Sequence, residues 1–305
     1  MINRWLGIAT FAIMASVNAA LFLRDILPGL LAGEPPPPQV MQLPDGYSLK
    51  SQAGIFNQRG ERMGYVWTIA KRDLDLLSVQ NCTVLGALHL PAGLSLPSLR
   101  IDTVMQFKLP ERRLDRLLVQ VMGLGVPIRL EGEFYPPDDF PCQWQVSDQR
   151  GSFVLTGISK ASLGEALRPF DSLTGLEVGQ SWRIELLDPL TGILPGLGRD
   201  RMLSRDMLVR VTARETIEHG GRRVEAFRVE GPALAAWVAE DGQVLRQTIR
   251  LPLLGEVMVE AEEYDEELRQ RVSRDFMSGG LFNPAALEAP YGHHRPPTDK
   301  KRETD

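Results

Sequence analysis

Near its start the chain carries an uninterrupted uncharged run. Residues 5–23 read WLGIATFAIMASVNAALFL and lie between Arg4 and the pair Arg24-Asp25. At 1.5 Å rise per residue, these 19 residues make a helix of about 28 Å, close to the roughly 30 Å of a bilayer's hydrocarbon core. The run also lacks the polar stripe of a helix that packs on a soluble core. Residues 1–31 are therefore predicted to form a single-pass transmembrane anchor.

The charges that flank this run predict which side of the membrane the rest of the chain occupies. Arg4 precedes the run, whereas Arg24 after it is offset by Asp25. Because positive charge favours the cytoplasmic side, we expect a domain outside the cytoplasm, on the periplasmic face of the inner membrane. The competing interpretation is a signal peptide cleaved after Ala19, which would release a secreted protein. The apolar run continues past Ala19, which favours the anchor, and both interpretations export the domain.

A proline-rich stretch follows the predicted anchor. The four consecutive prolines Pro35–Pro38 favour polyproline II, which is a stiff spacer of about 3.1 Å per residue. Residues 32–45 are therefore predicted to hold the exported domain off the membrane.

Alternation of apolar and polar residues dominates from residue 46 onward. Met63, Tyr65, Trp67 and Ile69 alternate with smaller or polar residues after a turn at 58–61, which predicts a strand behind a hairpin. Similar runs of strand length cover 76–85, 99–109, 114–122, 126–134, 142–147 and 151–157. Because these runs follow one another too closely to leave room for crossover helices, the sheet is predicted to be antiparallel.

A second series of strands begins at Met207. It follows a less regular stretch at 160–205, which is a candidate break between two halves of the domain. His219-Gly220-Gly221 turns the chain into a strand at 222–230. Asp241-Gly242 supplies the positive φ of a tight turn between strands at 234–239 and 243–251, and the last strand covers 256–262.

The period changes once more after the last strand. Tyr264, Leu268 and Val272 fall on one helical face, which predicts a short amphipathic C-terminal helix. Residues 46–276 are thus predicted to form a mainly β domain, with a transmembrane helix before it and this short helix at its end. Residues 277–305, rich in proline and charge, are predicted to be a disordered tail.

Composition narrows the classes of partner. The formal net charge of −5 and pI near 5.6 leave no excess of cations to neutralise a phosphate backbone, so nucleic acid is not expected as a partner. The two cysteines, Cys82 and Cys142, exclude a disulfide-dense scaffold and a four-thiolate zinc site. They are either one disulfide, which an oxidising compartment would favour, or two separate buried thiols.

Histidines and recognised motifs predict no catalytic, cofactor or metal site. His293 and His294 lie in the tail, His219 lies in a turn, and His89 stands between leucines, so no set of donors converges. The sequence contains no G-x-S-x-G elbow, P-loop or H-E-x-x-H motif.

Carboxylates gather at two places. Asp138 and Asp139 form a pair that a hydrolase would need, but their spacing matches neither a glycosidase pair nor a calcium loop. The acidic cluster at 260–267 is better explained as the first turn of the closing helix, where carboxylates oppose the positive end of the helix dipole.

Two loops are more apolar than exposed loops usually are. Leu88–Leu99 and Leu190–Leu197 either contact a partner or fold back onto the core. The candidate contact residues are Leu88, Leu90, Leu94, Leu96, Ile193, Leu194 and Leu197.

Three sequence elements carry a resemblance. Phe170-Asp171 leads to Leu176–Gly179, a strand enters Arg214–Ile217 before its Gly-Gly turn, and Trp237–Leu245 precedes Leu253-Leu254-Gly255. With these elements, residues 170–264 resemble an exported bacterial domain family of unknown function, allied in architecture to periplasmic lipoprotein carriers. The resemblance implies a curved antiparallel sheet or open barrel without a known active site, whose concave apolar face could hold a lipid or an extended peptide.

Two functional hypotheses follow. The first is a membrane-anchored periplasmic binding or scaffold module for an envelope lipid, lipoprotein or protein complex, motivated by the anchor, the spacer and the missing catalytic set. The second is an envelope hydrolase, or an accessory domain of one, that uses Asp138, Asp139 or another carboxylate. The two are distinguished by whether alanine at both aspartates abolishes function without loss of stability.

Overall fold

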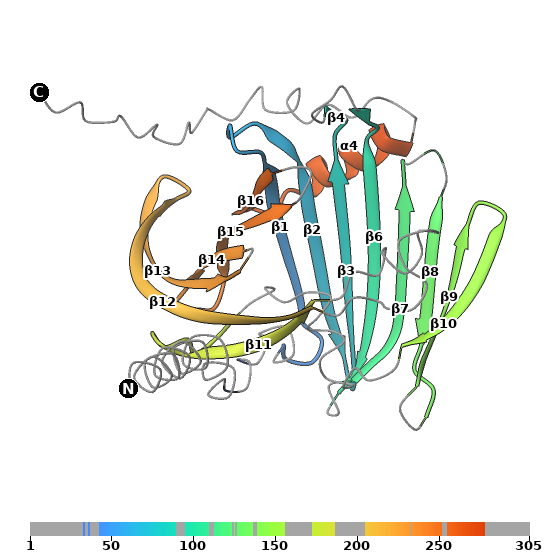
Figure 1. Cartoon of the computed structure of the whole chain (residues 1–305), viewed down its shortest axis with the longest axis horizontal. Coiled ribbons are helices and arrows are strands. Elements are labelled where there is room, and N and C mark those ends of the chain that lie inside the picture. The colour runs from blue at the N-terminus through green and yellow to red at the C-terminus, as the bar shows by residue number, and fades with distance from the viewer. Residues whose placement is uncertain are drawn as a thin grey trace, which may run out of the picture.

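The computed structural model describes most of the predicted β domain (Figure 1). Residues 5–23, the predicted membrane segment, lie outside it, as do most of the proline-rich stretch and all of the tail after Met277. The residues described are 33, 36, 43–89, 95–109, 113–123, 125, 127–136, 139–155, 173–186, 205–232, 234–251 and 255–277. Within these ranges no helix has the length and apolarity needed to cross a bilayer.

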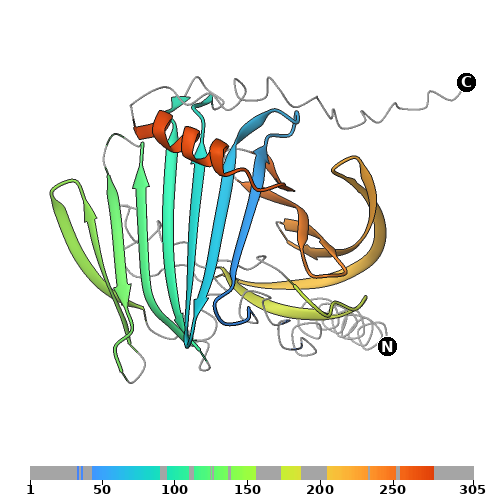
Figure 2. The ribbon, with the colours of Figure 1, turned by 180° about the vertical axis from the view of Figure 1, so that it is seen from behind.

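One antiparallel sheet of 14 strands organises these residues (Figures 1 and 2). The sheet is not closed, and β10 and β11 are its two edges. Its order is β10-β9-β8-β7-β6-β3-β2-β1-β16-β15-β14-β13-β12-β11. The first eight are β10 (Gln149–Leu155), β9 (Phe140–Val146), β8 (Ile128–Glu133), β7 (Arg113–Met122), β6 (Leu99–Lys108), β3 (Leu76–Leu85), β2 (Arg62–Asp73) and β1 (Ser48–Phe56). The other six are β16 (Gly255–Glu262), β15 (Val244–Leu251), β14 (Leu234–Ala239), β13 (Arg222–Gly231), β12 (Arg205–His219) and β11 (Ser181–Leu186).

Almost every neighbouring pair of strands is also consecutive in the sequence. There are two exceptions. β3 pairs with β6, and β1 lies beside β16, which joins the two series with Gln52 opposite Glu262 and Phe56 opposite Met258. The small hairpin of β4 (Leu88–His89) and β5 (Ser95–Leu96) is inserted between β3 and β6. The two predicted halves are therefore continuous in one sheet. The candidate break at 160–205 begins after the edge strand β10 and contains the other edge strand, β11, which the sequence did not predict.

The predicted strands and turns agree closely with the structure. The run at 76–85 is β3, the last strand is β16, and Gly242 has the positive φ (91°) expected of the turn before β15. The predicted closing helix is α4 (Glu266–Met277), with Leu268 and Val272 buried. The strands and the helix could be predicted because the period at which apolar residues recur, two in a strand and 3.6 in a helix, is a local property of the sequence.

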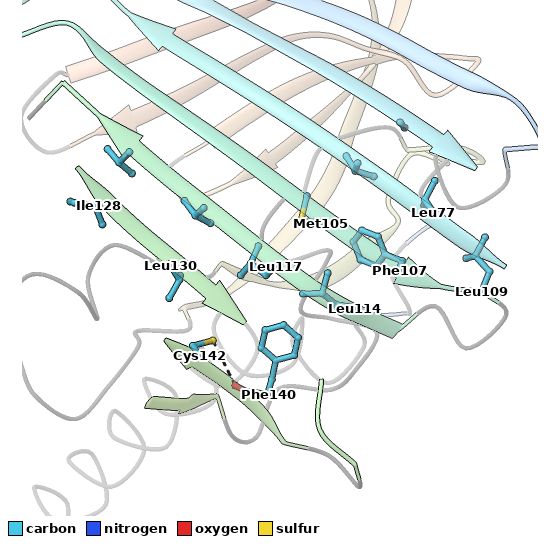
Figure 3. Packing of buried hydrophobic residues seen from close by; sticks show 14 residues of the cluster. Leu77, Met105, Phe107, Leu109, Leu114, Leu117, Ile128, Leu130, Phe140 and Cys142 are labelled. Atoms are coloured by element: carbon cyan, nitrogen blue, oxygen red, sulfur yellow. Dashed lines mark hydrogen bonds between the residues drawn. The ribbon is translucent and has the colours of Figure 1, made fainter. Parts of the chain in front are cut away.

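One face of the sheet is apolar across its first eight strands, and Figure 3 shows the buried side chains that gather on it, among them Met105, Leu117 and Cys142. The strand register places eight residues opposite one another in a single row that runs from β10 to β1. This row contains no polar side chain. Buried side chains around this row form the largest core cluster, and a second cluster covers the same face of β11–β14. The row consists of Phe153, Cys142, Gly132, Leu117, Met105, Val79, Ala70 and Leu49.

α4 lies on the opposite face, where it crosses the strands of the first series (Figure 2). Its Leu268 and Val272 pack on Tyr65, Trp67 and Cys82, which alternate with the residues of the apolar face. Buried Gln52 ties the helix to the sheet, since its Oε1 accepts hydrogen bonds from Trp67 Nε1 (2.7 Å) and the backbone N–H of Asp265 (3.0 Å).

Near its start the proline-rich stretch contacts the domain at Gly33. The N–H of Gly33 donates to the carbonyl of Ser181 (2.8 Å), and Gly33 forms a parallel bridge with Trp182 on the edge strand β11. Pro36 is buried. Gly33 therefore lies against an open strand edge, which offers unpaired backbone groups. The role of residues 32–45 as a spacer stays a prediction.

Candidate functional site

A polar row crosses the face of the sheet that is opposite to the apolar core. Arg228 on β13 lies opposite Trp237 on β14, Trp237 lies opposite Arg246 on β15, and Arg246 lies opposite Glu260 on β16. Side chains opposite each other on one face of an antiparallel pair are in contact range. The sheet therefore places two arginines, an indole and a carboxylate in one line, which we call the Arg-Trp-Arg row.

The β12–β13 hairpin folds back towards the end of this row (Figure 1). Its strands continue past the last residue of β13 that pairs with β14, Ala226, and reach the turn at His219. His219 Nδ1 lies 3.4 Å from Glu260 Oε1, although four strand positions separate β12 from β16. Arg246 Nη2 donates both to Glu260 Oε1 (3.0 Å) and to the carbonyl of Glu218 (3.1 Å). The hairpin tip is thus held by contacts to charged groups of the row.

Trp237 is fixed at the centre of the row. Its Nε1 donates to Glu215 Oε1 on β12 (2.5 Å), and the guanidinium of Arg228 lies 5.7 Å from its ring centroid. Arg228 Nη2 in turn pairs with Glu230 Oε1 at 2.6 Å. Each cation of the row therefore has an acidic partner, and the indole presents a half-buried planar surface between two guanidinium groups.

The surroundings of Glu260 favour its charged form. Burial by itself would raise the pKa of Glu260, but the hydrogen-bond contacts with His219 and Arg246 outweigh burial and lower it below its ordinary value. Glu260 is therefore a carboxylate at neutral pH and acts as an acceptor for two strands at once.

A second ionic centre lies two residues further along β16. Arg62 Nη2 pairs with Glu262 Oε1 at 2.6 Å, and its guanidinium lies over the rings of Phe56 (4.5 Å) and Tyr65 (4.6 Å). Gly54 makes room for this pair, since a Cβ there would lie 2.2 Å from Arg62 Nη1. This centre connects β1, β2 and β16, where the two series of strands meet.

These two centres present guanidinium, carboxylate and indole groups that can recognise polar groups. No nucleophile stands beside His219 in the contacts above, and no group of three histidine, cysteine or acidic residues among the described residues could hold a metal ion. Arginines fixed by carboxylates beside an indole are typical of binding surfaces. The same arrangement also stabilises the hairpin and the junction of the two strand series.

The predicted apolar contact residues are only partly covered by the described ranges. The backbones of Leu88 and Leu96 pair with each other in the β4–β5 hairpin. Leu90, Leu94, Ile193, Leu194 and Leu197 lie outside the described residues. Their role as a partner surface stays a prediction.

Cys82 and Cys142 are both free and buried, so the structure has the two-thiol alternative and not the disulfide. Cys82 packs beneath α4, whereas Cys142 belongs to the apolar core on the other face. β3 and β9 are also four strand spacings apart, which at about 4.8 Å each is roughly 19 Å and far beyond disulfide reach. Burial raises the pKa of each thiol to about 12, and Asp102 adds to this effect at Cys82.

The predicted carboxylate sites have different outcomes. Asp138 lies outside the described residues, and Asp139 is exposed, with its backbone bonded to that of Tyr135. In the acidic cluster, Glu266 and Glu267 do form the first turn of α4, as predicted. The helix-dipole explanation is wrong for Glu260 and Glu262, which lie on β16. They pair with arginines of other strands, because strand pairing decides which cation each carboxylate faces.

The Arg-Trp-Arg row was not found from the sequence. Arg228, Trp237 and Arg246 belong to three consecutive strands, but a β-bulge between Trp237 and Val238 shifts the register that places Trp237 opposite Arg246. The turn at Asp241-Gly242 is a usable signal for the hairpin, whereas a bulge has no dependable sequence signature.

Comparison with protein-family models gave no match for this chain, and comparisons with curated proteins and with solved structures gave none either. The resemblance of residues 170–264 therefore stays a prediction.

Proposed function

We propose that this chain is a membrane-anchored binding or scaffold module that faces the periplasm and serves an envelope lipid, lipoprotein or protein complex. The observation that carries the proposal is the one-sided sheet: one face bears an apolar row across eight strands, and the other bears charged pairs and α4. Ligand sites are mostly apolar surfaces with a few placed polar groups.

The arrangement supports an apolar or amphipathic ligand more than a small polar substrate. Side chains of the apolar face are buried, so a ligand reaches them only if this face opens. The sheet is not closed, and among the described residues no strand pairing joins its two edges. The apolar face can therefore open without breaking the hydrogen bonds between neighbouring strands. The apolar run at 5–23 supports attachment to the membrane.

The hydrolase hypothesis has no specific observation in its favour. Asp139 is exposed and Asp138 lies outside the described residues, so no pair geometry supports catalysis by them. We therefore advance the binding module alone.

In-cell photo-cross-linking tests the proposal. A benzoylphenylalanine at Trp144 faces the apolar core, whereas one at Gln143, the preceding residue of β9, faces the other side. We expect lipid or envelope-protein adducts, identified by mass spectrometry, from position 144 and few from position 143. The proposal fails if neither position yields an adduct and the detergent-purified chain carries no lipid.

A further inference from the structure

The two edges of the sheet differ in what lies beside them. At β11 the chain's own Gly33 supplies a parallel bridge to Trp182. At β10, in contrast, none of the residues that the structure describes pairs with the outer side of the strand. An uncovered edge is a template for another strand, since its outward N–H and C=O groups have no partner.

Hairpin geometry identifies the groups that point outward from β10. The two-residue turn Ser147-Asp148 makes Val146 and Gln149 a hydrogen-bonded pair, and bonded pairs then alternate along the ladder. The N–H of Ser147 donates to Pro127 on the β8 side (3.3 Å), which agrees with this alternation. The outward groups therefore belong to Arg150, Ser152 and Val154.

β10 has few of the features that protect edge strands. Its sequence, QRGSFVL, contains no proline and no lysine, and its one charge is Arg150 near the start. Val154 is 50% exposed, although it is a large apolar side chain, and Ser152 is exposed. Proline, lysine or a covering segment would normally block pairing at such an edge.

We propose that β10 is a homodimer interface, in which a second copy of the chain adds its own β10 antiparallel about a two-fold axis at Ser152. In this register Ser152 lies opposite Ser152 of the second copy, and Arg150 lies opposite Val154. All outward N–H and C=O groups then fall in hydrogen-bonded pairs. The two sheets become one continuous sheet.

Side chains on both faces fit this self-pairing. Gly151 comes opposite Phe153 of the second copy, and a Cβ at Gly151 would lie 2.5 Å from the Trp144 ring, so the indole already lies over the glycine. The phenyl ring of the second copy thus packs beside that indole, as aromatic residues opposite strand glycines do. The two Arg150 side chains lie at opposite ends of the paired segment, about 13 Å apart along the strands, and do not repel strongly.

Cysteine cross-linking tests both the interface and its register. Ser152→Cys in the purified full chain, in mild detergent, places two thiols opposite each other at a Cα separation of about 5.5 Å, within disulfide range. Arg150→Cys and Val154→Cys are matched controls, because neither residue faces itself. We expect about tenfold more disulfide dimer for Ser152→Cys than for either control, and dimer again when the two control variants are mixed. The native cysteines are buried and do not interfere.

A second pair of variants tests the edge without added thiols. Ser152→Pro removes an outward N–H that β9 does not use, whereas Ser152→Ala keeps it. We expect the wild type and Ser152→Ala to be dimers by light scattering and Ser152→Pro to be a monomer with unchanged circular dichroism. The proposal is overturned if Ser152→Cys stays monomeric while folded, if the single controls cross-link equally well, or if Ser152→Pro remains a dimer.

Discussion

Trp67 Nε1 donates to Gln52 Oε1 at 2.7 Å in a site where the indole is 1% exposed and Gln52 is 5% exposed. The same oxygen accepts the backbone N–H of Asp265 just before α4, and Gln52 Nε2 donates to Glu262. One amide therefore links β1 to β2, to β16 and to the helix. A buried donor left without its acceptor costs more than the hydrogen bond contributes.

Gln52→Leu should destabilise the fold. The substitution leaves the Trp67 indole N–H and the Asp265 N–H without an acceptor, and we expect a loss of about 2 kcal/mol in the free energy of unfolding. Chemical denaturation followed by fluorescence measures it. Gln80→Leu, at an exposed position on β3, is the matched control and should change stability by less than about 0.5 kcal/mol. Equal effects of the two variants would contradict the role assigned to Gln52.

Glu260 should make stability depend on pH in the acidic range. Its pKa is lower in the folded chain than in the unfolded chain, so its contribution is present above the unfolded pKa and is lost as pH falls through the folded pKa. Glu260→Gln should therefore cost roughly 1 kcal/mol at pH 7, and this difference should shrink below about pH 4. Denaturation curves of both proteins between pH 3 and 7 measure it.

The control for this prediction lies on the same strand. Glu256→Gln changes an exposed carboxylate and should leave the pH profile near that of the wild type. A constant difference between wild type and Glu260→Gln across the whole pH range would show that Glu260 acts by shape and not by charge.

Both thiols should be unreactive in the folded protein. Burial raises the pKa of Cys82 and Cys142 to about 12, so little thiolate exists at pH 8. A thiol reagent should modify no cysteine in the native chain and two after denaturation without reductant. If the denatured, unreduced chain showed no reactive thiol, the two cysteines would be joined in a disulfide, which contradicts this prediction.

Gly33 should protect the edge strand β11. Gly33→Pro removes the N–H that donates to Ser181, whereas Gly33→Ala keeps it and its Cβ would meet the Ser181 carbonyl at an ordinary 3.8 Å. We expect faster hydrogen exchange of β11 amides in Gly33→Pro, equivalent to about 1 kcal/mol, and unchanged exchange in Gly33→Ala. Identical exchange rates of the β11 amides in both variants would contradict the role assigned to Gly33 at this edge.

The sequence by itself determined the local elements of this protein. Strand limits such as 76–85, the glycine turn at Asp241-Gly242 and the face of α4 that carries Leu268 and Val272 follow from periodicity and backbone preference. These properties depend on residues a few positions apart, so a single sequence contains them. The antiparallel β class follows from the same short spacing.

Only the tertiary structure decided which distant residues meet. The pairing of β1 with β16, the bulge beside Trp237 and the return of the hairpin tip to Glu260 bring together Gln52, Glu262, Arg246 and His219 from separate parts of the chain. Side-chain period two specifies the face that a residue occupies but not the strand it lies beside. Which distant strands pair depends on the burial of apolar side chains and the pairing of charges over the whole sheet. No local sequence pattern contains this information.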